Sequence, residues 1–408
     1  MTTTLQKEWK IEDFDPRWPE FAKNPYPFYE RLRDESPVHY LKDMKLWLVT
    51  GYEEASTILM NPNFGKKMPE GYPSYVQQPP EKYKKLNELP DNMLDLDPPD
   101  HTRIRNLVAK PFTPKAIASL RPDIEKLVNS LLDKVEEKGE MDIVADLASP
   151  IPAIVIATML GVPLDDVDNF REWTTDLVRS FDATQGPEAR EKGYEAKLNL
   201  LYYFETLVEQ RRHNPTDDLI SELITIEEKG DKLAKDELLS MCILLLFAGY
   251  ETTVNLIAVG ARNLILNNDQ LQLLLSDPSL IKTAVEELMR YETPVQRIGY
   301  YTQVDTKIGG KELKKGEPVL VAVGGANRDK KIFENADKLD ITRSPNPHLG
   351  FGKGKHFCLG AFLARLEAEI AYTTLFTRFP NIRLLEQEGD WAPNTAHRRL
   401  LTLPVSLK

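Results

Sequence analysis

Cys358 lies in a glycine-rich loop that constrains the fold of this chain more than any other feature. Residues 351–360 read Phe-Gly-Lys-Gly-Lys-His-Phe-Cys-Leu-Gly, and a helical run follows over 361–370. Two glycines allow a tight loop whose backbone can approach a flat partner closely. A thiolate just before a helix faces the positive end of the helix dipole, which lowers the thiol pKa and makes the sulfur a good metal ligand. We therefore expect a metal-binding thiolate rather than a buried free cysteine.

The loop pattern Phe-Gly-x-Gly-x-His-x-Cys-x-Gly resembles the haem-ligand loop of the cytochrome P450 family at every fixed position. The resemblance implies that Cys358 is the thiolate ligand of a haem b iron, where its electron donation favours O–O cleavage. It extends over roughly residues 20–408, most clearly to soluble bacterial members that oxidise polyketides, fatty acyl chains or related natural products. Four further loop residues are implied to contact the haem: Phe351, Gly352, His356 and Gly360.

Composition disfavours several other classes of protein. The chain has 408 residues, of which 41% are hydrophobic, and this is enough for a large core. Lys plus Arg total 52 against 63 for Asp plus Glu, a net charge of −11 that disfavours nucleic-acid binding. Two cysteines, Cys242 and Cys358, fit a reducing cytoplasm. The N-terminus is polar, and the most apolar stretch, 241–247, is short for a bilayer. We expect a soluble, cytoplasmic monomer with no membrane segment.

Helical periodicity dominates the chain from residue 114 onward. Helices are predicted over 26–35, 117–137, 167–181, 194–212, 235–266 and 280–291. Strands are predicted over 46–50, within 300–320 around a Gly309-Gly310 hairpin turn, and over 400–407. The proline-rich segment 61–100 predicts an irregular loop. We expect one domain, 1–408, mainly α with a minor β-sheet region. The resemblance implies the triangular cytochrome P450 fold, with haem between the long central helix and the helix after Cys358.

A polar stretch interrupts the apolar run of the long predicted helix, where the sequence reads Ala-Gly-Tyr-Glu-Thr-Thr. Burying an acid and hydroxyls without partners is costly, so the alternative to a function is that Glu251 faces solvent. The stretch resembles the oxygen-binding kink of the family, which implies that Ala248 and Gly249 contact the haem. O–O cleavage consumes protons, and the resemblance implies that Thr252 positions the proton donor while Glu251 resupplies it.

Haem carries two propionates, so cations are expected at its rim. A stretch that reads Asp-Pro-Pro-Asp-His-Thr-Arg-Ile-Arg resembles the family's entry to its third helix. Within it, His101 and Arg105 match propionate-binding positions, as does His356 in the cysteine loop. Many relatives carry an arginine at the position of Tyr300, which can donate only one neutral hydrogen bond. Arg297 is the other candidate for that role, and the sequence leaves both open.

Glu287 and Arg290 are three residues apart and can pair on one helix face. Alone, such a pair is most often a solvated surface pair worth little. The family buries this pair and joins it to a further arginine, which Arg343 matches. We therefore expect these three residues to form a structural network that supports the haem loop.

The resemblance implies a haem-thiolate monooxygenase that inserts one oxygen atom of O2 into an apolar polyketide, fatty acyl, terpenoid or steroid-like substrate. Electrons are expected from a ferredoxin or flavodoxin with its reductase, which would dock near four lysines. These are Lys110, Lys115, Lys353 and Lys355. Two alternatives stay open: a hydrogen-peroxide-dependent peroxygenase, against which Glu251 and Thr252 argue, and a haem-based sensor or carrier. The expected pocket residues are Met93, Leu94, Phe181, Leu245, Val295, Ile298 and Ala396.

Overall fold

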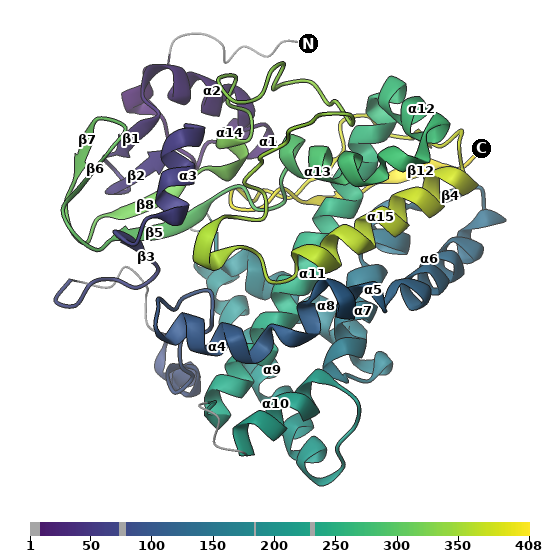
Figure 1. Ribbon diagram of the computed structural model, residues 1–408, viewed down its shortest axis with the longest axis horizontal. Helices are drawn as coiled ribbons and strands as arrows, with labels where there is room; N and C mark the ends of the chain where they lie inside the picture. Colours follow the sequence, from purple (N-terminus) through teal and green to yellow (C-terminus); the bar gives the residue numbers. More distant parts are fainter. Residues whose placement is uncertain (1–8, 73–78, 183–184, 229–232) are drawn as a thin grey trace.

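Helices make up most of the protein and surround one long central helix, α11 (Figure 1). The computed structural model describes residues 9–72, 79–182, 185–228 and 233–408. The α-helices of these residues are α1 (Pro19–Lys23), α2 (Tyr26–Glu35), α3 (Tyr52–Met60), α4 (Asp100–Val108), α5 (Pro114–Ala118), α6 (Arg121–Glu136), α7 (Pro150–Leu160), α8 (Val167–Ser180), α9 (Pro187–His213), α10 (Leu219–Glu228), α11 (Lys235–Leu266), α12 (Asn268–Ser276), α13 (Ile281–Tyr291), α14 (Val323–Ala326) and α15 (Ala361–Arg378).

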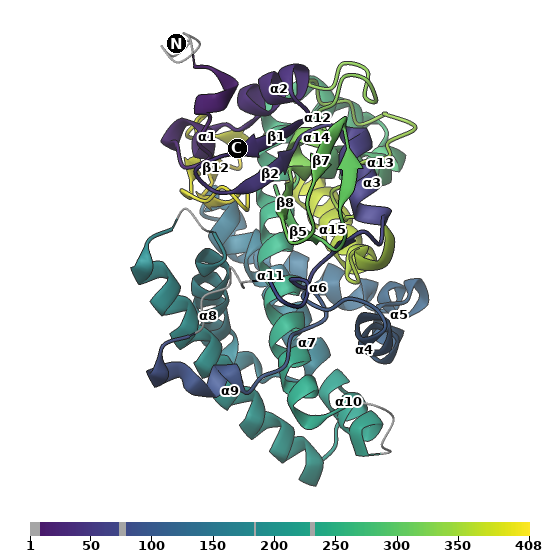
Figure 2. The same ribbon diagram turned by 90° about the vertical axis from the view of Figure 1, so that its left-hand side faces the viewer.

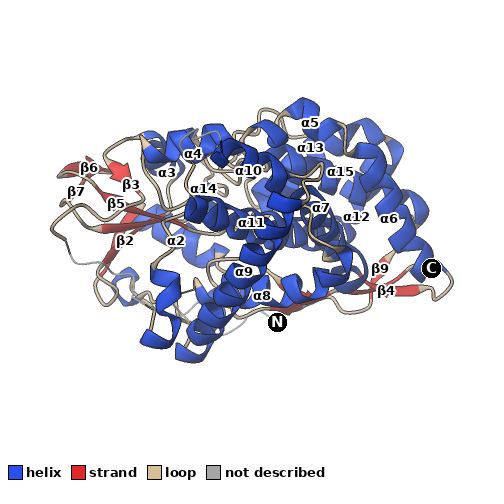
Figure 3. Ribbon diagram, turned by 90° about the horizontal axis from the view of Figure 1, so that it is seen from below, coloured by secondary structure: helices blue, strands red, loops and turns tan. Residues whose placement is uncertain are grey.

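The strands are short, and those of the two larger sheets lie at opposite ends of the molecule in Figure 3. The largest sheet has the order β1-β2-β8-β5-β3, in which only the β2–β8 pair is parallel. The second has the order β4-β12-β9, and β6-β7 and β10-β11 form two-stranded ladders. The strands are β1 (Val38–Leu41), β2 (Leu46–Val49), β3 (Phe64–Gly65), β4 (Glu140–Asp142), β5 (Ile298–Thr302), β6 (Thr306–Ile308), β7 (Lys311–Leu313), β8 (Pro318–Val321), β9 (Arg383–Leu384), β10 (Asp390–Trp391), β11 (Leu400–Thr402) and β12 (Pro404–Ser406).

The central helix α11 is buried over most of its length. It packs against α7, α8, α9 and α15, and Figure 2 shows it running through the middle of the molecule. Its apolar run, 238–247, is buried at every residue. A helix that is hydrophobic on all sides belongs in the core of a large protein, because no face of it is suited to water.

A close contact joins α11 to α15, the helix that follows the cysteine loop. Tyr372 on α15 donates its hydroxyl to the Leu256 carbonyl of α11 at 2.5 Å, and its side chain is fully buried. A Cβ at Gly260, one turn further along α11, would lie 2.0 Å from that hydroxyl oxygen. Glycine at this position therefore sets how closely the two helices approach.

The predicted helices agree with the fold in type, but one of them is divided in two, and the helix predicted over 194–212 begins earlier, at Pro187. The predictions for 26–35 and 235–266 are confirmed residue for residue as α2 and α11. The single helix predicted over 117–137 is instead two helices, α5 and α6, with a break at Ser119 and Leu120. Pro122 explains the break, because it lacks the N–H that a continuous helix needs and fits the first turn of a new one.

The predicted strands and loop are mostly confirmed. Gly309 and Gly310 have φ of +52° and +76° and join β6 to β7 as a hairpin, since a type I′ turn needs two such residues. The strand predicted over 400–407 is divided into β11 and β12. Within the predicted loop 61–100, the structure has β3 and a 3₁₀ turn over Glu81–Asn87, and residues 73–78 lie outside the described part. The helix α7 was missed because its sequence is apolar on all faces and shows no helical period.

Two segments, Ile143–Leu160 and Lys235–Leu266, are long and apolar enough to cross a membrane by length and composition. The short apolar stretch 241–247 therefore belongs to a longer apolar helix, and its length alone does not exclude a membrane span. In both segments most of the apolar window, 67% and 78%, is buried inside the protein. Core helices have the same composition, so these segments are weak evidence for a membrane span.

Candidate active site

The cysteine loop is a tight turn that leads directly into α15. The Cys358 amide donates to the Phe351 carbonyl at 2.8 Å, which closes the loop. Gly352 and Gly354 both have φ of +70°, a conformation that favours glycine. A Cβ at Gly354 would also lie 2.7 Å from the Leu59 carbonyl oxygen at the end of α3. Glycine is thus favoured at both positions by the positive φ. At Gly354 it is also required because a side chain would clash with α3.

The Cys358 thiol is accessible to solvent, although protein atoms surround it densely enough to desolvate it. Burial raises the pKa of this thiol, while a backbone hydrogen bond from Gly360 and the charges of Arg105 and Arg365 only partly oppose the rise. The predicted lowering of the pKa is therefore wrong for the protein alone, because desolvation outweighs the helix terminus. Coordination to a metal ion would reverse this balance by deprotonating the thiol. Cys242, as predicted, is a fully buried core residue.

Glu287, Arg290 and Arg343 form one ionic network between α13 and the segment before the cysteine loop. Glu287 and Arg290 are both fully buried, and Arg290 Nε is 2.8 Å from the Glu287 carboxylate. Arg343 Nε is 3.0 Å from the same carboxylate. The remaining hydrogen bonds of the network run to Asn327, Glu334, Ala336, Lys338, Asp340 and Asn346. Because each charge has partners, the network can hold the segment that leads to Cys358.

A second charged cluster, which sequence reasoning missed, links α13 to α15. Glu286 accepts from Arg365 Nη2 at 2.9 Å and lies 2.9 Å from His348 Nε2. The Arg365 guanidinium also lies 4.2 Å from the centroid of the Phe351 ring. Burial acts to raise the pKa of Glu286, but the hydrogen bonds from Arg365 and His348 outweigh it and lower the pKa to about 2. The residues are far apart in the sequence, so no local pattern signals the cluster.

Glu251 and Thr252 lie side by side on α11, where its apolar run is interrupted. Thr252 donates its hydroxyl to the Ala248 carbonyl at 2.8 Å. Glu251 is only 2% exposed, which excludes the alternative that it faces solvent. Its carboxylate lies 3.3 Å from Arg399 Nε. Burial raises the pKa of Glu251, although the charge of Arg399 opposes the rise.

The predicted cofactor contacts His101, Arg105 and His356 come together where α4 meets the cysteine loop. The centroids of the two histidine rings are 4.2 Å apart. Arg105 donates to the Phe357 carbonyl at 2.8 Å. His101 is buried, and neither of its ring nitrogens has a hydrogen-bond partner among the residues that the structure describes. Burial and the surrounding positive charges lower the pKa of His356 to about 3. An anionic ligand would satisfy these groups.

Arg297 and Tyr300, the two candidates for the role of the arginine that many relatives carry at position 300, lie in different surroundings. Arg297 donates to the Thr395 hydroxyl in the segment before β11. Tyr300 is buried, and its ring lies beneath the ammonium of Lys66, a residue that sequence reasoning missed. The charge of Lys66 contributes to the lowered pKa of His356, so Lys66 belongs to the cluster around that histidine. In the sequence, Lys66 is one ordinary charged residue of a proline-rich loop.

The predicted pocket residues come from several segments that the fold brings together in part. The Phe181 ring, largely exposed, packs against the Phe247 ring of α11, with 5.5 Å between centroids. An isolated β-bridge between Val295 and His397 places Ala396 near Val295. Met93 and Leu245 are buried and Leu94 is exposed. The half-buried members of the predicted pocket and haem contacts include Ala248, Gly249 and Ile298.

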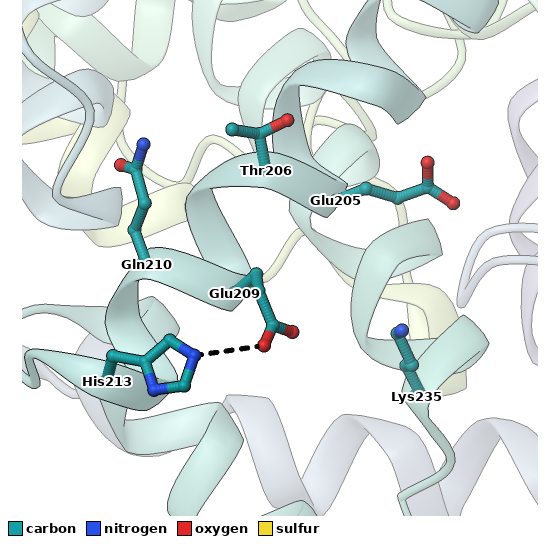
Figure 4. A pocket seen from close by; sticks show the side chains of 6 residues that line it. All are labelled: Glu205, Thr206, Glu209, Gln210, His213 and Lys235. Carbon is teal, nitrogen blue, oxygen red and sulfur yellow. Dashed lines mark ion pairs between the residues drawn. The ribbon is translucent and has the colours of Figure 1, made fainter.

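A polar hollow between α9 and the start of α11 lies apart from these residues (Figure 4). His213 Nε2 and Glu209 Oε1 are 3.3 Å apart within it, and both side chains are largely exposed. Lys235 in the hollow lies about 24 Å along the α11 axis from Glu251, at 1.5 Å per residue. The lining residues are Glu205, Thr206, Glu209, Gln210, His213 and Lys235. The hollow is therefore not part of the candidate site.

Known proteins match this chain over nearly its whole length. The family model for cytochrome P450 matches residues 38–275 and 274–407. The biotin biosynthesis cytochrome P450 of Bacillus subtilis (strain 168) is 41% identical over 95% of this chain and 98% of that protein. The polyketide biosynthesis cytochrome P450 PksS of the same organism is 39% identical over 97% and 98%. A crystal structure of P450BioI with hexadec-9Z-enoic acid ligated acyl carrier protein has a TM-score of 0.88 at 41% identity, covering 95% of this chain and 99% of that one.

These matches show that the chain belongs to the cytochrome P450 family and has its fold. It is therefore a cytochrome P450 oxidoreductase, an enzyme class that uses haem ligated by a cysteine thiolate. The site residues fit that group. Cys358 is the accessible cysteine among the two in the chain, and the buried His101 has a ring N–H that could donate to an anionic group.

Proposed function

We propose that this protein is a haem-thiolate monooxygenase in which Cys358 binds the iron of haem b and one oxygen atom of O2 enters an apolar acyl-type substrate. The observation that carries the proposal is the buried acid Glu251 next to the half-buried hydroxyl residue Thr252, on the helix that packs against α15. Such a pair suits proton delivery, which a haem protein that only carries or senses a gas does not require.

Haem supplies the redox chemistry when bound, because a thiolate-ligated iron favours O–O cleavage. We propose that the chain holds this group from three directions. Cys358 with its loop, and α11 through Ala248 and Gly249, would hold the ring of this group. Charged and polar side chains from α4, β5 and the loop bind its carboxylates. The proposed cofactor contacts besides Cys358 are His101, Arg105, Ala248, Gly249, Tyr300, Phe351, Gly352, His356 and Gly360.

Glu251 is proposed to carry protons from the protein surface to Thr252. Its raised pKa leaves the carboxyl protonated for a larger share of time near neutral pH than an exposed glutamate. Arg399 links it to solvent, since 25% of the Arg399 side chain is exposed against 3% for Glu251. The Thr252 hydroxyl can both accept and donate a hydrogen bond, so it can position a proton at the reacting oxygen. Movement of Glu251 from Arg399 toward Thr252 would deliver one proton.

The substrate is proposed to be a fatty acyl or polyketide chain. Two relatives are named for biotin and polyketide biosynthesis, and P450BioI is in complex with an acyl carrier protein that bears hexadec-9Z-enoic acid. The predicted pocket residues of this chain are apolar, and the Phe181–Phe247 ring pair offers an aromatic wall. Titration with free and carrier-linked acyl chains should change the haem spin state in proportion to binding.

Electrons are proposed to come from a ferredoxin or flavodoxin with its reductase. Lys353 and Lys355 of the cysteine loop are exposed, and so is Lys115 on α5. An acidic partner protein would be attracted to these positive charges. Lys110 is a weaker candidate because its ammonium pairs with Glu222 at 2.7 Å. We also propose that residues 1–408 act as one domain in a cytoplasmic monomer.

Product analysis under isotopically labelled dioxygen tests the proposal. The enzyme should receive a surrogate ferredoxin, its reductase, reduced nicotinamide and the acyl chain that gives the largest spin shift. One labelled oxygen atom should appear in each product molecule. A faster reaction with hydrogen peroxide than with the electron donor would favour a peroxygenase instead. Binding without product under either condition would contradict both enzyme functions and favour a carrier or sensor.

A further inference from the structure

Lys66, which directly follows β3, lies close enough to His356 for its charge to act on that histidine, the partner of His101 in a histidine pair. β3 pairs with β5, which brings Lys66 alongside Tyr300. The Lys66 ammonium lies 3.8 Å from the centroid of the Tyr300 ring and 2.8 Å from the Gly299 carbonyl oxygen. Its positive charge is among the causes that lower the pKa of His356. The cation thus lies at the same edge of the site as the two histidines.

Asp97 fixes the backbone of Lys66 relative to the histidine pair. The N–H groups of Lys66 and Lys67 donate to the Asp97 carboxylate at distances of 2.9 to 3.0 Å. The Asp97 carbonyl accepts from the His101 N–H at 3.1 Å. One residue therefore anchors both the chain that carries Lys66 and the first turn of α4, so the two cannot move apart independently.

The Lys66 ammonium is a half-buried charge without an anionic partner in the described part of the chain. Within the described part of the chain, its direct partners are one carbonyl oxygen and one aromatic ring, and no carboxylate lies within ion-pair distance. Burial lowers the pKa of Lys66 to about 8, although Asp95 and Asp97 oppose the change from longer range. His101 nearby has two buried ring nitrogens without partners. A carboxylate placed here would meet a charged donor and a neutral one.

We infer that Lys66 binds a haem propionate and supplies the charge that an arginine at position 300 would supply. The inference rests on the proposed function, because it requires haem beside the cysteine loop. Tyr300 then acts through its ring, which supports the ammonium by a cation–π contact. A hydrogen bond from an ammonium to a carboxylate is stronger than one from a neutral phenol. The Nη2 of Arg297 donates instead to the Thr395 hydroxyl.

Haem transfer from the holoenzyme to excess apomyoglobin tests the inference. Lys66→Met should lose haem about tenfold faster than the parent, the equivalent of one charge-assisted hydrogen bond. The matched control is Lys67→Met, since Lys67 pairs with Asp91 at the surface and should leave the rate unchanged. Lys66→Arg should stay close to the parent. Tyr300→Arg, added to Lys66→Met, should restore slow transfer. Resonance Raman bands of the propionates should shift in Lys66→Met and recover in the double variant.

Two results would overturn the inference. The first is equal haem transfer from Lys66→Met, Lys67→Met and the parent. The second is faster transfer from Lys66→Met with unchanged propionate bands and no recovery on adding Tyr300→Arg, because this pattern would mean that Lys66 only packs against Tyr300. Failure of the proposed function is a separate outcome, since the parent itself would then lack the thiolate-type spectrum of its reduced carbon monoxide complex.

Discussion

The cysteine side of the site and the α11 side differ in how their polar groups are satisfied. On the cysteine side, the buried Glu287 carboxylate has two arginine partners and further hydrogen bonds from the surrounding chain. On the α11 side, Glu251 has one partly exposed partner at 3.3 Å, and within the described part of the chain neither side-chain polar atom of the buried Asn255 has a hydrogen-bond partner. A saturated network resists movement, whereas groups with spare hydrogen-bonding capacity can exchange partners.

This difference suggests that the two sides have different roles. The cysteine side holds the ligand and its loop in place, and the α11 side moves protons. Substitutions on the cysteine side should therefore reduce folding and haem content, and those at Glu251 and Thr252 should leave the fold intact while changing the chemistry. Substitutions on each side test whether the two roles are separate.

The largest effect is expected for Glu287→Ala. Removing this carboxylate leaves Arg290 and Arg343 without their anionic partner. Because Arg290 is fully buried, the loss should cost about 3–5 kcal/mol of folding free energy. Little soluble, haem-loaded protein should be recovered. Lys282→Ala, at an exposed position of the same helix, is the control and should behave as the parent. A fully haem-loaded and stable Glu287→Ala protein would mean that the network is not structural.

A smaller loss is expected for Gly260→Ala. The added Cβ would lie 2.0 Å from the Tyr372 hydroxyl oxygen, so α11 and α15 must separate, at a cost of about 1–3 kcal/mol. Urea unfolding measures this change. Gly299→Ala is the control, because a Cβ at Gly299 meets no atom within 4 Å. Equal stability of the two variants would show that the α11–α15 contact adapts easily.

Thr252→Ala should fold normally and bind haem, yet yield about tenfold less product per reduced nicotinamide, with hydrogen peroxide in its place. The reason is that O–O cleavage consumes protons that the hydroxyl positions. Thr252→Ser keeps a hydroxyl and should retain most of the yield. Peroxide assays beside product analysis give the ratio. An unchanged ratio in Thr252→Ala would remove this residue from proton delivery.

The smallest effect concerns the pH dependence of stability through Glu286. Its pKa is about 2 in the fold against an ordinary value of 4.5, so the stabilisation is complete above that ordinary value and fades as the pH falls toward 2. From pH 6 to pH 4 the parent should lose about 0.5–1 kcal/mol more than Glu286→Gln. Urea midpoints at both pH values measure the difference. Parallel losses in the two proteins would show that Glu286 is not held in its charged form.

The sequence predicts best where the residues that act together are near one another in the chain. The Cys358 loop, the bounds of α11 and the Glu287–Arg290 pair all follow from local patterns. The partners Arg399 of Glu251 and Lys66 of Tyr300 do not, because only the folded chain brings them together.

Burial explains two other errors. The helix terminus does act on the Cys358 thiol, but desolvation, which depends on tertiary packing, raises its pKa. Tertiary packing also decides how the long helix α11 is interpreted. Its short apolar run belongs to a helix long enough to cross a membrane, and 78% of the apolar window of that helix is buried inside the protein. Local patterns state which groups are present, and packing decides the balance between opposing effects.

The spectrum of the reduced carbon monoxide complex tests the central claim, that Cys358 is the thiolate ligand of a haem iron. The parent and Cys242→Ser should both show the thiolate-type spectrum, because Cys242 is a core residue. Cys358→Ser should bind haem weakly or lose that spectrum. A thiolate-type spectrum that survives unchanged in Cys358→Ser would contradict the claim.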